Sequence, residues 1–145
     1  MAKVEKAVER EKEFYENIEK WQKLEDTTIE SAEEIIAKTD NIVVKTIMDV
    51  IKRDSEKHKM ILQQIKDVLT KAYTLRPDEV GEIMGLLEKH RKIEKDAIQM
   101  AEDGLGNARV FAIRHLLTYI LEDERKHHRM MVDLGDFRRE LYPYG

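Results

Sequence analysis

The chain has 145 residues, of which 39% are charged and 6% aromatic, and its formal net charge is -4. This length is enough for one domain with a buried core, and the dominance of Glu, Lys, Ile, Leu and Ala is typical of long amphipathic helices. The absence of cysteine excludes disulfides, a catalytic thiol and any cysteine-ligated metal site.

The charge pattern and the apolar runs exclude two further classes of protein. Basic and acidic residues alternate along the chain, so no basic face predicts a nucleic-acid partner. No apolar run approaches the roughly 20 residues of a membrane span, and the N-terminus is too charged for a signal peptide. We therefore expect a cytoplasmic protein that binds neither nucleic acid nor membrane.

Apolar residues at helical spacing predict a first helix over about 4–38 and a second over about 41–72. The break between them is Thr39-Asp40-Asn41, whose side chains can cap the N-terminus of the second helix. The apolar positions of the first helix are Val4, Ala7, Phe14, Ile18, Trp21, Ile29, Ala32 and Ile36. Those of the second helix are Val44, Ile47, Met48, Ile51, Leu62, Ile65 and Leu69.

A third helix is predicted over about 78–103, after a connection that contains Pro77. Proline lacks the amide that a continuous helix needs, so the second helix cannot simply run on. This connection can be a short turn or a crossover along the molecule. We expect the third helix to end at the glycines of 104–106.

The fourth helix is predicted over about 107–134 and ends at Gly135. In the remaining tail, 135–145, we expect Phe137, Tyr142 and Tyr144 to fold back on the helices or on a partner subunit. Four helices of this length predict an all-α domain spanning 1–145, a four-helix bundle built from two helical hairpins. The alternative is a pair of hairpins that becomes a bundle only in a dimer.

The chain contains an internal repeat without gaps, in which about 18–60 aligns with about 87–129 at an offset of 69 residues. Each half places a glutamate in the apolar stripe of its first helix, Glu25 or Glu94. Each half also places a histidine in the stripe of its second helix, His58 or His127. Such groups are costly to bury without partners, so the repeat indicates a shared polar site.

The second half carries an additional carboxylate, Glu124, three residues before His127 and on the same helix face. A Glu from each of two helices and a Glu-x-x-His from each of the other two form the ligand set of ferritin-like di-metal carboxylate bundles. Over about 19–131 the chain resembles this superfamily, and rubrerythrin-type proteins in particular. The resemblance implies that Glu25 and Glu94 are terminal ligands, Glu124 is a bridging ligand, and His58 and His127 are imidazole ligands.

The chain departs from the family at Ser55, where the second bridging glutamate is expected. A bridging carboxylate offsets the repulsion between two nearby cations, so its loss weakens the first metal position. His90 lies one turn before Glu94 and is a candidate additional ligand. Tyr119 can act as a hydrogen-bond donor near the site or simply as a packing residue.

Three functions are consistent with these residues. The resemblance implies an iron-binding protein, with manganese or zinc as alternatives, which holds one or two ions and reacts with dioxygen or peroxide. Because no rubredoxin-like domain is present, such a reaction would need an external electron donor, and a homodimer or higher homo-oligomer is expected. The second function is a degenerate bundle with one structural metal, and the third is a metal-free interaction module.

Overall fold

The computed structural model describes residues 1–71 and 81–141, the last five of these by their backbone alone. Within these ranges the regular structure is entirely helical, which confirms the all-α class. The helices are α1 (Ala2–Lys38), α2 (Ile42–Thr70), α4 (Met84–Asn107) and α5 (Phe111–Leu141).

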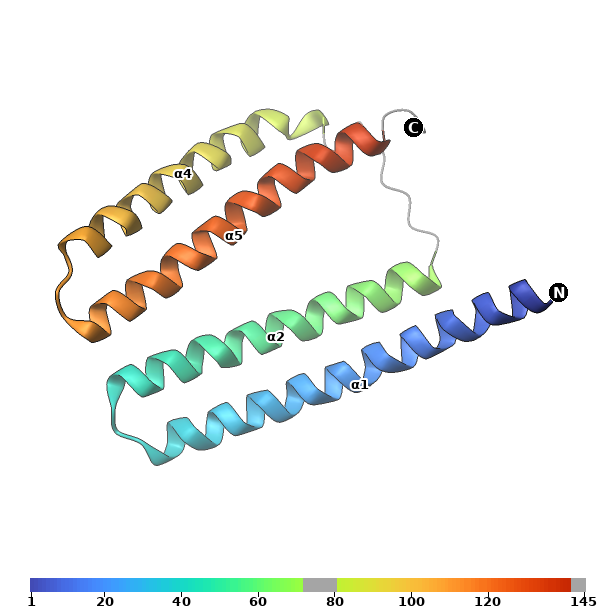
Figure 1. Ribbon diagram of the computed structural model, residues 1–145, viewed down its shortest axis with the longest axis horizontal. Coiled ribbons are helices and arrows are strands. Elements are labelled where there is room, and N and C mark those ends of the chain that lie inside the picture. Colours follow the sequence, from blue (N-terminus) through green and yellow to red (C-terminus); the bar gives the residue numbers. More distant parts are fainter. Residues whose placement is uncertain (72–80, 142–145) are drawn as a thin grey trace. The chain divides into compact units, whose positions relative to one another are not determined.

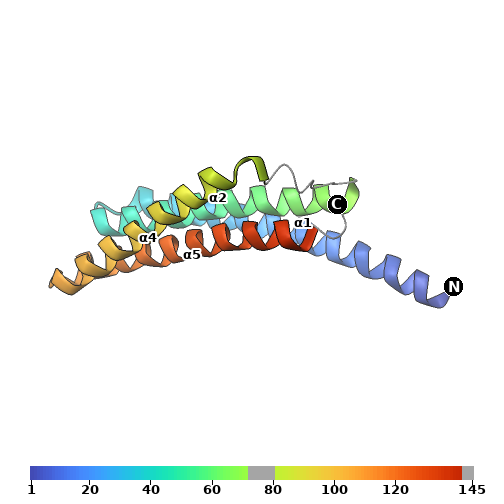
Figure 2. The same ribbon diagram turned by 90° about the horizontal axis from the view of Figure 1, so that it is seen from above.

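The helices form two hairpins, each a compact unit of its own. α1 packs along α2 in the first hairpin, and α4 packs along α5 in the second, as Figures 1 and 2 show from two directions. Construction from two helical hairpins is therefore confirmed. Their closure into one four-helix domain over 1–145 stays a prediction, and the connection around Pro77 lies outside the described residues.

The turn of the first hairpin follows the predicted capping chemistry. Asn41 Oδ1 accepts hydrogen bonds from the backbone N–H groups of Val43 (3.0 Å) and Val44 (3.2 Å), which have no partner within the helix. In the second hairpin, the Arg114 side chain donates to the carbonyl oxygens of Leu105 (2.7 Å) and Ala108 (2.9 Å). Both connections are thus held by side chains that satisfy free helix ends.

The most buried residues on three of the helices recur every seventh position, which is the spacing of a narrow helix–helix seam. They are Ile18, Glu25 and Ala32 on α1, Ser55 and Leu62 on α2, and Glu94 and Ala101 on α4. The interface between the two helices of each hairpin therefore contains one buried glutamate, Glu25 or Glu94, among apolar neighbours.

The predicted stripes were wider than the seams. Trp21 and Ile51 are substantially exposed. On α5, Leu121 is buried (6% exposed), whereas the adjacent Ile120 is 53% exposed. A helical stripe spans about 100° of the helix surface, whereas one partner helix covers only its middle. Residues beside the seam consequently remain exposed although they fit the helical period.

Two helix ends were predicted wrongly. α4 continues through Gly104 and Gly106 to Asn107, and α5 continues through Gly135 to Leu141, so the predicted tail begins as helix. No described glycine has a positive φ, so none adopts the left-handed conformation that ends a helix. A single glycine costs a helix only about 1 kcal/mol relative to alanine, which neighbouring residues can offset.

The glycine at 104 faces α5. An added Cβ there would meet the Leu117 side chain at 3.4 Å, which is about an ordinary van der Waals contact. α4 begins at Met84, after a turn at Ile83 that follows two further helical residues, 81–82. The predicted start at 78 lies outside the described residues. The proposed packing of Phe137, Tyr142 and Tyr144 concerns side chains outside the described part of the chain.

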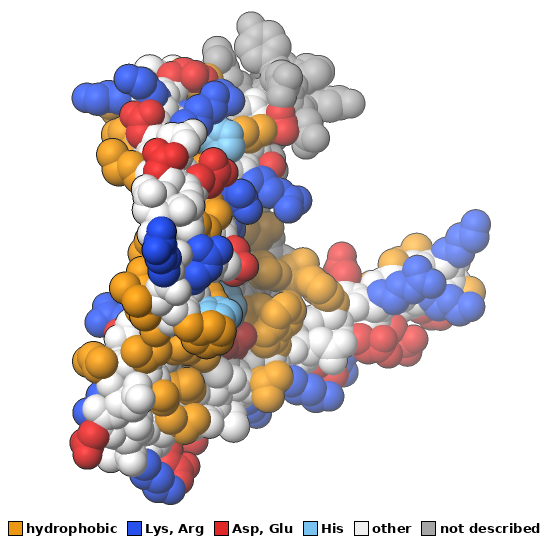
Figure 3. All heavy atoms as spheres, turned by 60° about the vertical axis from the view of Figure 1, so that its left-hand side comes forward, with side chains coloured by type: hydrophobic (Ala, Val, Ile, Leu, Met, Phe, Trp, Pro, Cys, Tyr) orange, Lys and Arg blue, Asp and Glu red, His pale blue; other side chains and the backbone are white. Residues whose placement is uncertain are grey.

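α1 is longer than α2, with 37 residues against 29, and its N-terminal end runs past the end of α2 (Figure 1). Figure 3 shows this segment as an arm covered mainly by charged side chains. Val4 and Val8 are exposed there, so the first part of the predicted apolar stripe buries little surface. None of the described helices is long and apolar enough to cross a membrane.

We predict that Gly135→Ala raises the free energy of unfolding by about 0.5–1 kcal/mol, because alanine loses less backbone entropy in a helix. An added Cβ at this position meets no atom within 4 Å, so no clash opposes the gain. Urea denaturation measures the change. Gly135→Pro is the matched control and should destabilise by about 3 kcal/mol. A destabilised alanine variant would show that the helix ends at this glycine after all.

Candidate metal centre

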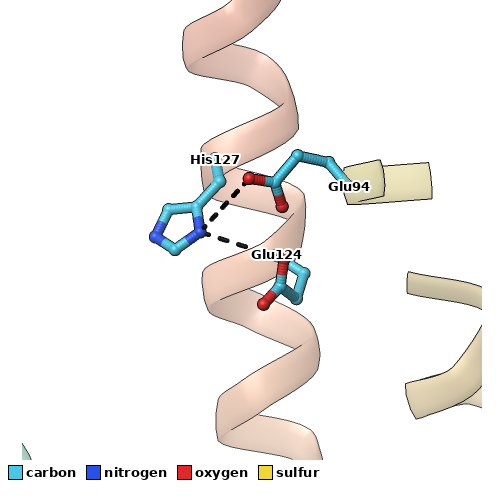
Figure 4. A group of neighbouring side chains, drawn as sticks. All are labelled: Glu94, Glu124 and His127. Atoms are coloured by element: carbon cyan, nitrogen blue, oxygen red, sulfur yellow. Dashed lines mark ion pairs between the residues drawn. The ribbon is translucent and has the colours of Figure 1, made fainter. Parts of the chain in front are cut away.

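Three potential ligands converge in the second hairpin. Glu94 projects from α4, and Glu124 and His127 project from α5, one turn apart on the same face (Figure 4). One ligand atom from each residue lies within 4.8 Å of the other two. Glu94 is only 6% exposed, and its partners on α5 are partly buried.

The separations within this cluster fit a single cation. His127 Nδ1 lies 3.8 Å from Glu94 Oε1 and 3.9 Å from Glu124 Oε2, the two pairs joined by dashed lines in Figure 4. Ligand atoms typically lie about 2.0–2.2 Å from a bound divalent ion, so two of them are separated by about 3–4 Å. The two measured separations fall in that range.

The two carboxylates of the cluster interact directly. A hydrogen bond with Glu124 lowers the pKa of Glu94 against the opposing effect of burial, and His90 and the charge of His127 lower it further. The same hydrogen bond, together with burial and the negative charge of Glu94, raises the pKa of Glu124. Without a cation, the interaction between the two carboxylates therefore favours protonation of Glu124 over protonation of Glu94.

His90 adjoins the cluster from the preceding turn of α4. Its Nε2 lies 2.9 Å from Glu94 Oε1, the oxygen that His127 also approaches. His90 therefore lies beside Glu94, and its role at a metal site stays a prediction. Its exposed ring can either orient this carboxylate or supply a lone pair of its own.

The first hairpin brings Glu25, Ser55 and His58 together at the equivalent place. Glu25 is 8% exposed, and its Oε1 accepts a hydrogen bond from Trp21 Nε1–H at 3.0 Å. His58 Nδ1 lies 3.3 Å from the same oxygen. Ser55 is 4% exposed and is one of the two buried residues of α2, with Leu62. The predicted residues thus surround one carboxylate rather than two.

Hydrogen bonding keeps Glu25 ionised. Burial raises its pKa, but hydrogen bonds from Ser55 and Trp21 and the charge of His58 together outweigh that effect. The net result is a pKa below the ordinary glutamate value. The Ser55 hydroxyl, the Trp21 indole and the His58 imidazole therefore stabilise the ionised Glu25 carboxylate, and no second carboxylate is involved.

The structure places Tyr119 away from the cluster. Five residues before Glu124, it lies about 140° around the helix, and its ring is 6.3 Å from that of His115. This position agrees with a packing role. Combination of the ligands from both hairpins into one centre stays a prediction, because each hairpin is described by itself.

The contact between Trp21 and Glu25 was missed in the sequence, where Trp21 counted only as an apolar stripe residue. A signal was available, because the 69-residue repeat aligns Trp21 with His90. In both cases a nitrogen-containing ring lies four residues before the buried glutamate. The aligned pair could therefore have indicated a shared ring contact.

Comparison with known proteins adds no family name. No protein-family model matches the chain, and neither curated proteins nor solved structures match it significantly.

We predict that Ser55→Ala destabilises the protein by about 1 kcal/mol at pH 7, because a buried carboxylate loses a hydrogen bond. The folded-state pKa of Glu25 lies below its unfolded value, so its contribution is present above about pH 4.3 and is lost as the pH falls through the folded-state pKa. The difference between the variant and the wild type should accordingly shrink below about pH 4. Denaturation at several pH values measures it, and a pH-independent difference would contradict the assigned hydrogen bond.

Proposed function

We propose that the protein binds a divalent metal ion at Glu94, Glu124 and His127, as a ferritin-like iron protein would. The observation that supports this proposal most is the convergence of two carboxylates and an imidazole in the second hairpin, where one ligand atom of each residue lies within 4.8 Å of the other two. Glu94 is buried, Glu124 is partly buried, and His127 Nδ1 lies 3.8 Å and 3.9 Å from their oxygens. A cation can offset the repulsion between the two carboxylates and interact favourably with all three groups.

The alternative of an ordinary ion pair with a basic side chain has little support. Among the described residues, Glu94 pairs with His90 and His127 and with no Lys or Arg. Arg91, three residues before Glu94, instead donates to Glu88 at 3.1 Å. The cluster consequently contains ligand atoms but no permanent positive charge.

The ligand chemistry narrows the choice of metal. Carboxylate oxygens and imidazole nitrogens suit iron, manganese and zinc. The resemblance to ferritin-like proteins favours iron, which would supply redox chemistry with dioxygen or peroxide. In this scheme the carboxylates bind and orient the ion, His127 supplies a neutral nitrogen, and an external donor provides electrons. The same resemblance favours a homo-oligomer.

A structural or storage metal without redox turnover is the second candidate. Ser55 favours it, because this residue stands where the family has a bridging carboxylate and instead hydrogen-bonds Glu25. The two candidates share the metal site and differ in its reactivity.

We predict that purification without chelator yields bound metal, and that added iron, manganese or zinc raises the melting temperature of the wild type. A ligand at 100 times its Kd stabilises the folded state by about 2.7 kcal/mol. His127→Ala and Glu124→Ala should abolish this response. Glu122→Ala, an exposed carboxylate on the same helix, is the matched control and should retain it. Wild-type protein that binds none of these ions would overturn the proposal.

Reactivity then separates the two candidates. If the site is redox-active, adding peroxide to the ferrous protein should change its visible or near-ultraviolet absorbance, and His127→Ala should remove the change. A wild-type ferrous protein that binds metal but shows no absorbance change would support the structural role.

A further inference from the structure

The two hairpins share a framework but differ in the groups that surround the buried glutamate. The 69-residue offset aligns Glu25 with Glu94 and His58 with His127, which are identical pairs. It also aligns two pairs that differ: Trp21 with His90, and Ser55 with Glu124. These two differences decide what each glutamate can bind.

The first difference concerns the ring one turn before the glutamate. Trp21 Nε1 lies 3.0 Å from Glu25 Oε1, and His90 Nε2 lies 2.9 Å from Glu94 Oε1, so the two rings take the same position. An indole nitrogen only donates a hydrogen bond, whereas a neutral imidazole also offers a lone pair. The first hairpin therefore has a donor to the carboxylate where the second has a potential metal ligand.

The second difference concerns charge. The buried Ser55 hydroxyl hydrogen-bonds Glu25 without adding charge. Glu124 at the equivalent place adds a second carboxylate, which interacts with Glu94 directly. Indole, hydroxyl and imidazole donors thus stabilise the single anion of the first hairpin. The second hairpin has two carboxylates and two imidazoles, a set that a dication completes.

We propose that the chain holds one metal ion, on the second hairpin alone, and that Trp21 and Ser55 take the place of an ion beside Glu25. The ligands are then Glu94, Glu124 and His127, and His90 orients the Glu94 carboxylate. This inference rests on the proposed metal binding and assigns its stoichiometry and its location. It also makes the first hairpin a metal-independent part of the same protein.

Exchanging the two differing pairs between the hairpins tests the inference. Trp21→His with Ser55→Glu gives the first hairpin the donors of the second, and His90→Trp with Glu124→Ser does the reverse. Each new side chain already occupies the equivalent position of a folded hairpin in this protein. Circular dichroism and thermal unfolding check that the variants fold.

Zinc(II) is the probe, because it is redox-inert, and equilibrium dialysis with elemental analysis counts the bound ions. We expect one zinc ion per wild-type chain, two for the first exchange and none for the second. His90→Ala alone should weaken binding by about 10–100-fold. Glu25→Ala and His58→Ala should leave one ion bound with unchanged affinity, and they serve as single-residue tests if an exchange variant does not fold.

The outcomes separate this inference from the proposed function. Two zinc ions per wild-type chain, or weaker binding after Glu25→Ala or His58→Ala, would overturn the single-hairpin site while metal binding itself stands. A first exchange that folds but still binds one ion would show that Trp21 and Ser55 do not exclude the metal. Wild-type protein that binds no zinc, iron or manganese would overturn both.

Discussion

The structure depends on the burial of one carboxylate in the seam of each helical hairpin. Glu25 and Glu94 occupy positions at which apolar residues pack one heptad away, Ile18 and Ala32 in one case and Ala101 in the other. An ionised group without partners is strongly unfavourable in such a place. The neighbouring residues of each hairpin must therefore supply hydrogen bonds, a proton or a cation.

The two hairpins meet this requirement differently. Around Glu25, neutral and imidazole donors keep the carboxylate ionised. Around Glu94, a second carboxylate replaces a donor, and its hydrogen bond with Glu94, its burial and the charge of Glu94 raise the pKa of Glu124. Metal binding and folding are consequently linked in the second hairpin but not in the first, under the function proposed above.

Much of the architecture could be predicted because helices follow from local periodicity and capping. The break at Thr39 and the cap at Asn41 are local features, and both were correct. The ends of α4 and α5 were not, because glycine permits a helix end without requiring one. Whether α5 stops at Gly135 depends on the total helical stability of the residues around it, which a single residue does not reveal.

The sequence by itself determined that the protein is helical, that its helices pair as two related hairpins, and which glutamate and histidine side chains share a face. Helical period and repeat offset are sufficient for those conclusions. The tertiary structure decided that the Trp21 indole reaches Glu25, that Glu94 and Glu124 interact with each other, and that Leu121 rather than Ile120 is buried. These features depend on side-chain rotamers and on the closeness of the partner helix, and a period in the sequence specifies neither.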